Sequence, residues 1–530
     1  MDAGDLNLRR AAAWLRAMAG AGVEEICACS GARSAPLLAL LAGIRGIRVY
    51  RFFEERSAAF FALGRSRAAR RPVAVVTTSG TAAAELLPAA VESYYEGIPL
   101  LLVTADRPAR FRGTGAPQCI EQKDLFGIYA PTLADDGGDA APTLEAWDRR
   151  GPAHLNLRFD EPLLPGEIPA LEIRSVPAAP PPPPEADPSL AARALEDLER
   201  PLVLLGALAE EERKPVKDFL LRLGAPVYAE AESGLREDPE LEELLLRAGE
   251  AFVPCLDRRG VLRIGSVPTL RLWRDLERRD PGEPVVSLSP LPFSGLSLST
   301  HICCSPGKIL GRIRPRPADR DFTRASIEQD RAAAAELEAL YAAEPLSEPA
   351  LVRELSLFPP EGSLVYLGNS MPIREWNLAA RPFPRGLSVL SSRGANGIDG
   401  QVSTFLGLAR PGRENWAVLG DLTVLYDLAA PWILRSLSGI RTRIVVINNR
   451  GGRIFGRILK DPFFQDEHGI GFSDWAGMWG LHYYSWEGGL FDPPDGEALL
   501  VEVLPDLEAS ARFWKAYDEL FGAWKRRMKP

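Results

Sequence analysis

The sequence is poor in cysteine and lacks any long apolar run. Its 530 residues include only 6 Cys, and the closest pairs are Cys27 with Cys29 and Cys303 with Cys304. This number and spacing exclude a disulfide scaffold and a zinc ribbon, so we expect free thiols. No stretch approaches the roughly 20 apolar residues that cross a membrane. Charges interrupt the only candidate for a signal peptide, and we expect a cytoplasmic protein.

An excess of basic residues is also missing. Lys and Arg number 62 and Asp and Glu number 71, which gives a net charge of −9. Binding to nucleic acid or to an anionic membrane generally needs a basic face, so we expect neither partner. Histidines are rare, at positions 154, 301, 468 and 482. They form no metal-ligating or triad pattern, and we assign them no role.

The length and two linkers predict three domains. At roughly 150 residues per domain, the chain has room for about three. Val176–Pro188 is proline-rich and therefore extended, and Arg312–Pro317 is a weaker linker that leads into a helical pattern at 325–343. We place the domains at 1–175, 189–315 and 345–530.

All three parts have the pattern of an α/β protein. Short apolar runs bounded by turn residues predict buried parallel strands, and helical patterns lie between them. The predicted strands are 73–77, 100–104, 202–205, 227–230, 364–367, 416–419, 444–447 and 499–503, and helices are expected at 81–95 and 210–223. We predict three α/β domains, each with an open parallel sheet, whose ligands bind at the carboxyl ends of the strands.

Two polar pairs follow predicted strands in the last domain. Gly420-Asp421 ends one strand and Asn448-Asn449 ends the next, with room for one helix between them. This spacing brings both pairs to the same sheet edge. A carboxylate, an amide oxygen and a backbone carbonyl suit Mg²⁺, and a helix N-terminus can receive a diphosphate. Each pair alone is more simply a helix cap or a turn, but together they favour a metal–diphosphate site.

This arrangement resembles the fingerprint of thiamine-diphosphate enzymes such as decarboxylases and acetohydroxyacid synthases. The resemblance implies that Asp421, the Asn449 side chain and the Gly451 carbonyl bind Mg²⁺, for which Mn²⁺ is a possible substitute. The choice of Asn449 over Asn448 depends on counting back from Gly451-Gly452. The remaining cofactor contacts implied by the resemblance are Gly420, Leu422, Thr423, Ile454 and Phe455.

Such enzymes also need a carboxylate at the cofactor's aminopyrimidine. Glu55 follows the apolar pair Phe52-Phe53. A carboxyl group in apolar surroundings keeps its proton more readily and can donate it to a ring nitrogen. Glu54 is a competing candidate, and a surface ion pair between Glu55 and Arg56 is the structural alternative.

Further motifs narrow the resemblance to one family. They are CSGARSAPL at 29–37, TADRPARFRGTGAPQCIEQKDLFG at 104–127, GPAHLNLRFDEPL at 151–163, GNSMPIR at 368–374, SRGANGIDG at 392–400 and NNRGGRIF at 448–455. In this order they resemble the MenD family of menaquinone biosynthesis. The resemblance implies decarboxylation of 2-oxoglutarate on thiamine diphosphate and 1,4-addition of the succinyl unit to isochorismate. Three open parallel-sheet α/β domains of the thiamine-diphosphate decarboxylase/synthase type are implied as well.

Both expected substrates are dianions, and arginine forks pair with carboxylates bidentately. By similarity, Arg33, Arg107 and Gln118 face isochorismate, whereas Ser370, Arg374 and Arg393 face the part derived from 2-oxoglutarate. Arg271 keeps a cationic position of the family. Ile398 matches the bulky apolar residue that bends the cofactor. A lone surface arginine is the alternative for each Arg, and a core residue is the alternative for Ile398.

Some positions depart from the family pattern. Ala32 and Leu270 replace hydroxyl residues, and Pro117 precedes Gln118 where a polar residue is common. Two other functions therefore stay open, namely another thiamine-diphosphate decarboxylase or carboligase and a non-catalytic homologue. In this superfamily, the active site joins the first domain of one subunit to the last domain of another. The resemblance thus implies a homodimer or a homotetramer.

Overall fold

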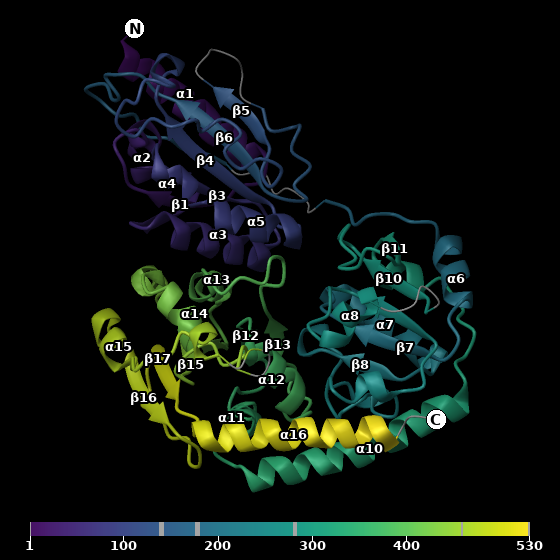
Figure 1. Cartoon of the computed structure of the whole chain (residues 1–530). Coiled ribbons are helices and arrows are strands. Elements are labelled where there is room, and N and C mark those ends of the chain that lie inside the picture. Colours follow the sequence, from purple (N-terminus) through teal and green to yellow (C-terminus); the bar gives the residue numbers. More distant parts are fainter. Residues whose placement is uncertain are drawn as a thin grey trace. The chain divides into compact units, whose positions relative to one another are not determined.

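The computed structural model describes residues 2–136, 143–174, 181–278, 283–456, 459 and 461–527. Three sheets follow one another along the chain, and every strand pair in them is parallel (Figure 1). The prediction of three parallel-sheet α/β parts is therefore confirmed. In the described residues, no helix is long and apolar enough to cross a membrane.

The first sheet has the order β2-β1-β3-β4-β6-β5. Its central strands β3 and β4 are buried along their whole length, which explains the apolar runs VAVV and LLLV with which they begin. The strands are β1 Glu25–Cys29, β2 Arg48–Phe52, β3 Val73–Thr77, β4 Leu100–Asp106, β5 Thr132–Asp136 and β6 Ala153–Arg158. The helices are α1 Ala3–Gly20, α2 Ala35–Ala42, α3 Glu55–Ala69, α4 Thr81–Ala84 and α5 Leu87–Glu96.

The second sheet has the order β11-β10-β9-β7-β8. Its strands are β7 Pro201–Leu205, β8 Val227–Ala229, β9 Gly260–Ile264, β10 Val285–Ser289 and β11 Thr300–Cys303. The helices are α6 Pro188–Glu196, α7 Glu210–Leu223, α8 Arg271–Asp275, α9 Pro306–Leu310 and the long α10 Arg320–Ala343. Residues 176–180 of the first predicted linker lie outside the described residues, and 181–187 contain no helix or strand.

The third sheet has the order β13-β12-β14-β15-β17-β16. Its strands are β12 Leu364–Leu367, β13 Ser388–Leu390, β14 Glu414–Gly420, β15 Arg441–Ile447, β16 His482–Trp486 and β17 Ala498–Val503. The helices are α11 Glu348–Leu355, α12 Met371–Ala379, α13 Gln401–Leu408, α14 Asp421–Tyr426, α15 Ser473–Trp479 and α16 Leu507–Arg527. In α16, buried residues recur on one face, as expected of an amphipathic helix.

Contacts within the chain define two compact units. Unit 1 comprises Met1–Pro182, Ser392–Arg410 and Thr423–Gly439, and unit 2 comprises Pro183–Ser391, Pro411–Leu422 and Ile440–Pro530. Two segments from the last third of the sequence thus belong to the unit of the first sheet. This grouping does not test the three predicted domain boundaries, which stay a prediction.

Helices α3 and α13 cross closely inside unit 1. A Cβ atom on Gly64 would lie 2.2 Å from the carbonyl oxygen of Thr404, and a Cβ on Gly407 would lie 2.2 Å from that of Phe61. Real side chains do not tolerate such distances, so glycine is required at both positions. The crossing connects α13, which follows the SRGANGIDG motif, to the helix that begins at Glu55.

Candidate active site

Unit 1 contains an open pocket of about 790 Å³ beside the carboxyl ends of β1 and β3. Turns after these two strands, the start of α3, and Tyr426 form its wall. The carboxylates of Glu54, Glu55 and Glu85 line it, together with Gln118. Ligands of open parallel sheets bind at this edge, so the pocket is the candidate binding site of unit 1.

Glu55 is the first residue of α3 and is half-buried. Burial raises the pKa of Glu55; the hydrogen bond from its own backbone N–H opposes this change, and the charges of Glu54 and Glu85 add to it. The proton-holding carboxyl group expected from the sequence is consistent with this environment.

The carboxylate of Glu54 has a structural task. It accepts hydrogen bonds from the backbone N–H groups of Arg56 and Ser57 at 2.9 Å each, and so caps α3. Arg56 turns away from Glu55, because its guanidinium donates to the carbonyl of Tyr426 at 2.8 Å. The two alternatives were Glu54 as the functional carboxylate and an ion pair between Glu55 and Arg56. In the structure, Glu54 caps α3 and Arg56 binds the Tyr426 carbonyl instead.

The residues predicted to bind isochorismate differ in how many hydrogen bonds their side chains already form within the protein. The Arg33 guanidinium is buried and donates to the carbonyl of Phe159 at 3.0 Å and to Glu161 at 2.9 Å. The Arg107 guanidinium donates through Nε to the carbonyl of Pro117 at 3.1 Å and lies over the ring of Phe111. Among the described residues its two terminal nitrogens have no hydrogen-bond partner, so they are able to form a fork. Gln118 is exposed at the pocket with a φ of 56°, a left-handed conformation.

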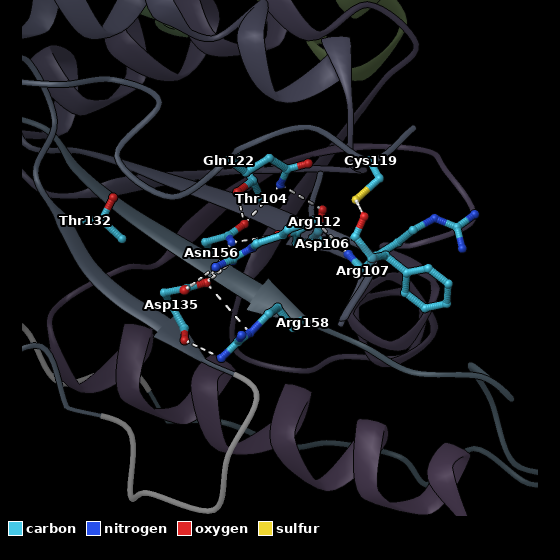
Figure 2. A network of polar contacts seen from close by, with 12 residues as sticks. Thr104, Asp106, Arg107, Arg112, Cys119, Gln122, Thr132, Asp135, Asn156 and Arg158 are labelled. Atoms are coloured by element: carbon cyan, nitrogen blue, oxygen red, sulfur yellow. Dashed lines mark hydrogen bonds and ion pairs between the residues drawn. The ribbon is translucent and has the colours of Figure 1, made fainter. Parts of the chain in front are cut away.

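A polar network holds the ends of β4, β5 and β6 together (Figure 2). Asn156 is its centre: the amide nitrogen donates to Asp106 and Asp135 at 2.9 Å each. The amide oxygen accepts from Thr104 and Gln122 at 3.0 Å each. Because every hydrogen-bonding atom of this buried amide has a partner, the network fixes the strand end from which the Arg107 segment leaves.

Arg112 and Gln122 tie that segment back to the sheet. Arg112 forms a two-nitrogen fork with Asp135, at 3.0 and 2.6 Å. Burial raises the pKa of Asp135, but the hydrogen bonds from Arg112 and Asn156 outweigh it, and the net pKa is lowered. Gln122 accepts from the backbone N–H of Gly80 at 2.9 Å, which joins the segment to the turn at the pocket.

The buried Glu92 and the half-buried Glu96, both on α5, hold the SRGANGIDG loop. Glu92 accepts from the backbone N–H groups of Gly394 at 2.8 Å and Ala395 at 2.6 Å, and Glu96 accepts from that of Arg393 at 2.8 Å. Burial raises the pKa of Glu96 to about 7. The loop that carries Arg393 and the half-buried Ile398 is therefore anchored through its backbone.

The second candidate site lies in unit 2, where β14 and β15 end side by side. Gly420 pairs with Ile447, so the residues that follow both strands share one edge of the sheet. The buried Asp421 carboxylate accepts from the backbone N–H groups of Leu422 at 2.7 Å and Gly451 at 2.9 Å. The βαβ spacing thus brings Asp421 and Gly451 together.

The two asparagines that follow β15 are used differently. Asn448 donates to the carbonyl of Ile470 at 2.9 Å and to Glu502 at 2.6 Å, and its oxygen accepts from the Arg450 N–H at 3.3 Å. Asn449 donates its nitrogen to Glu348, whereas its buried Oδ1 has no partner among the described residues. Of these two asparagines, Asn449 is therefore the one whose oxygen has no hydrogen-bond partner in the described residues.

These groups fit a small hard cation. The Asp421 carboxylate, the Asn449 Oδ1 and the Gly451 carbonyl are the oxygen types that Mg²⁺ prefers. Gly451 has a φ of 137°, and a Cβ there would lie 2.5 Å from the carbonyl oxygen of Gln465, so a side chain is excluded. Within the described part of the chain, no group of three or more His, Cys, Asp or Glu residues can hold a metal ion, so a cation here depends on amide and carbonyl oxygens.

The other predicted residues occupy more varied positions. In unit 2, Ser370 has a φ of 72° and its carbonyl accepts from Arg374 at 2.6 Å. Arg271 is exposed and 3.3 Å from Asp275. Of the predicted cofactor contacts, Gly420, Leu422 and Ile454 are half-buried, Phe455 is exposed, and Thr423 is buried in unit 1.

The structure adds two residues that the sequence analysis did not assign. His468 places Nε2 3.2 Å from the Asp421 carboxylate. Glu348 contacts Asn449 and is itself buried; burial raises its pKa to about 7, against the hydrogen bonds from Asn449 and Glu375. No local signal marks either residue, because both contacts join distant parts of the sequence.

Comparison with known proteins assigns the cofactor class. The family model described as "Thiamine pyrophosphate enzyme, N-terminal TPP binding domain" matches residues 9–125. This range contains Arg33, Glu55, Arg107 and Gln118. The matched segment includes most of the first sheet and much of the unit 1 pocket.

Curated relatives match nearly the whole chain. A protein of Bdellovibrio bacteriovorus is 42% identical over 98% of this chain and 99% of its own length. One of Akkermansia muciniphila is 42% identical over 92% and 94%, and one of Rubrobacter xylanophilus is 36% identical over 87% and 88%. All three are named 2-succinyl-5-enolpyruvyl-6-hydroxy-3-cyclohexene-1-carboxylate synthase.

Proposed function

The chain belongs to the 2-succinyl-5-enolpyruvyl-6-hydroxy-3-cyclohexene-1-carboxylate synthase family, and from this we propose that it catalyses that synthase reaction. It is a thiamine-diphosphate enzyme that decarboxylates 2-oxoglutarate and adds the succinyl unit to isochorismate. The observation that carries this proposal is the B. bacteriovorus relative, which covers 98% of the chain and whose name states the product.

Glu55 is the proposed catalytic residue of unit 1. Its half-buried carboxyl group lines the pocket, and burial raises its pKa above the usual value of a glutamate. In this role Glu55 holds a proton at its carboxyl oxygen and donates it to a ring nitrogen of the cofactor. Glu54 supports this role indirectly, because its cap fixes the first turn of α3.

Unit 2 supplies the proposed diphosphate site. Asp421, the Asn449 Oδ1 and the Gly451 carbonyl would hold Mg²⁺, or Mn²⁺ in its place, and N–H groups after β14 would face the diphosphate. When bound, thiamine diphosphate supplies the electron sink for loss of carbon dioxide. The protein's own part is to position the reacting groups and to exclude water.

Arginines are proposed to recognise the two dianionic substrates. Arg107 has two terminal nitrogens available for a carboxylate, and Gln118 lies at the pocket, so both are assigned to isochorismate. Arg33 is assigned to the same substrate, although it would share its guanidinium with Glu161. Ser370, Arg374 and Arg393 are assigned to the 2-oxoglutarate part, Arg271 to a cationic position, and Ile398 to the apolar support of the cofactor.

The proposed assembly is a homodimer or a dimer of dimers in the cytoplasm. Glu55 belongs to unit 1 and Asp421 to unit 2, and the proposal requires both at one cofactor. A second subunit would supply one of the two halves.

The test is product analysis by mass spectrometry with 2-oxoglutarate and isochorismate. Product is expected only when both substrates, Mg²⁺ and thiamine diphosphate are present. Steady turnover of pyruvate without isochorismate would indicate another decarboxylase or carboligase. Failure to bind thiamine diphosphate in the presence of Mg²⁺ would indicate a non-catalytic homologue.

A further inference from the structure

We propose that Glu348 is a positioning residue that holds the Asn449 amide with its oxygen toward the metal. This inference rests on the magnesium site proposed above and adds a residue to it. Glu348 does not belong to the proposed ligand set. Its side chain acts through Asn449, the residue that offers the free oxygen.

The geometry allows one orientation of the amide. Both carboxylate oxygens of Glu348 lie 3.0 Å from Nδ2 of Asn449. An ionised carboxylate only accepts hydrogen bonds, so with Glu348 ionised the NH₂ group must face it and the oxygen must face the opposite way. Both side chains are almost fully buried, with exposed fractions of 3% for Glu348 and 5% for Asn449, so water does not compete for this contact.

The backbone of Glu348 is fixed independently of Asn449. Glu348 begins α11, and its N–H donates to the hydroxyl of Ser510 on α16 at 2.9 Å. Ser347 caps the same helix by accepting from the N–H of Ala350 at 3.4 Å. Two contacts from other residues thus fix the backbone from which the Glu348 side chain extends to Asn449.

The neighbouring asparagine shows that this arrangement is specific. Asn448 is also oriented by a buried glutamate, Glu502, but its oxygen is occupied by the Arg450 N–H. The Asn449 Oδ1 is buried and has no partner in the described residues. A buried amide oxygen without a partner lowers the stability of the fold, and a metal ion bound to this oxygen would remove that cost.

The test measures Mn²⁺ binding by electron paramagnetic resonance, with the full-length protein and saturating thiamine diphosphate. In Glu348→Gln, one of the two acceptor oxygens that face Nδ2 becomes an NH₂ group that can donate to Oδ1, so the Asn449 amide is no longer held in a single orientation. Loss of such a supporting contact typically weakens metal affinity about 10- to 100-fold. We expect a Kd increase in this range. An unchanged Kd would overturn the proposal.

Glu344→Gln is the matched control. Glu344 lies four positions earlier, and its carboxylate pairs with Arg512 at 2.7 Å. The same chemical change there should leave the Mn²⁺ Kd as in the wild type. An equal loss in both variants would contradict a specific role of Glu348.

An exchange of the two groups separates positioning from a structural role. Asn449→Asp alone places two carboxylates against each other and should weaken binding. In Glu348→Gln/Asn449→Asp, the glutamine NH₂ donates to the new carboxylate, which still presents an oxygen. We expect this double variant to bind Mn²⁺ more tightly than either single variant. Failure to recover affinity would contradict the positioning role, and this variant keeps the test available if Glu348→Gln does not fold.

Asp421→Ala distinguishes failure of the inference from failure of the proposed function. If this variant binds Mn²⁺ as well as the wild type does, the metal site itself is wrong. If it loses binding while Glu348→Gln keeps it, the metal site stands and only the role of Glu348 is wrong.

Discussion

Gly64 of α3 lies against Gly407 of α13, and a Cβ added to either residue would come within 3.0 Å of the Cα of the other. The contact joins the helix that begins at the proposed catalytic Glu55 to the helix that follows the loop with Arg393. No side chain can be accommodated there without separating the two helices. The relative position of the start of α3 and the Arg393 loop in unit 1 therefore depends on glycine at both positions of this contact.

Gly407→Ala should destabilise unit 1. A methyl group placed in a packed contact costs about 1–3 kcal/mol, although alanine favours a helix more than glycine does. Urea unfolding followed by circular dichroism measures the change. Gly20→Ala is the control, because nothing lies within 4 Å of a Cβ at that position near the end of α1. Equal stability of Gly407→Ala and Gly20→Ala would show that the crossing is looser than described.

Glu55→Gln should lower turnover and leave thiamine-diphosphate binding largely intact. The amide keeps the size of the side chain but cannot hold and release a proton, and loss of an acid–base group lowers the rate by about 10²–10⁴-fold. Steady-state kinetics and calorimetric titration with the cofactor measure the two effects. Glu54→Gln is the comparison; its main effect should be on stability, since Glu54 caps α3. Turnover near the wild-type rate in Glu55→Gln would remove Glu55 from its assigned role.

Arg107→Ala should raise the KM for isochorismate much more than the KM for 2-oxoglutarate. Among the described residues its two terminal nitrogens have no hydrogen-bond partner, and a bidentate pair with a carboxylate would be lost. Truncation of one partner of a charged hydrogen-bonded pair costs about 2–5 kcal/mol. Kinetics with each substrate varied in turn measure the split. An equal rise in both KM values would contradict the assignment of Arg107.

His154 should make the stability of the fold depend on pH. The imidazole is fully buried on β6 between the hydroxyls of Thr104 and Thr132, at 2.8 and 3.0 Å. Burial lowers its pKa from 6.5 to about 4, against the charges of Asp124 and Asp135. The unfolded chain therefore binds a proton between pH 6.5 and 4 that the folded chain does not, and stability from this group falls as the pH decreases through that range.

The His154 contribution is on the order of 3 kcal/mol between the two limits. His154→Gln should lose stability at pH 7 but less at pH 4.5, so its unfolding free energy should change less with pH than that of the wild type. Urea unfolding at several pH values measures the slope. His482→Gln, at an exposed position, is the control. Parallel pH profiles for wild type and His154→Gln would contradict this account.

The sequence predicted the central strands better than the edge strands. β3 and β12 have the expected bounds, because both are continuous apolar runs buried on two faces. β2 (RVYRF) and β16 (HYYSW) were not predicted, since edge strands keep polar residues toward solvent. The single helix expected at 81–95 is divided into α4 and α5, with a proline at the start of α5.

The site was predictable where its residues lie close in sequence or in motifs. Asp421 and Asn449 follow adjacent strands, so the βαβ spacing alone predicted that they share one edge of the sheet, whereas Gly451 was implied by the resemblance. Glu348 could not be found in this way, because its contact with Asn449 joins residues 101 positions apart. Glu92 is a similar case, since its contact with Gly394 of the SRGANGIDG loop joins residues 302 positions apart. Such contacts depend on packing, for which local sequence carries no signal.

Unit 1 is built from three separate segments of the chain, and this affects how it can fold during synthesis on the ribosome. Its first sheet is complete early, but Ser392–Arg410 and Thr423–Gly439 leave the ribosome only when most of the polypeptide has been translated. Until then, the face of α3 that receives α13 stays uncovered. The nascent chain must carry this exposed surface throughout synthesis of the whole second sheet, the period in which it is most vulnerable to aggregation and most dependent on chaperones.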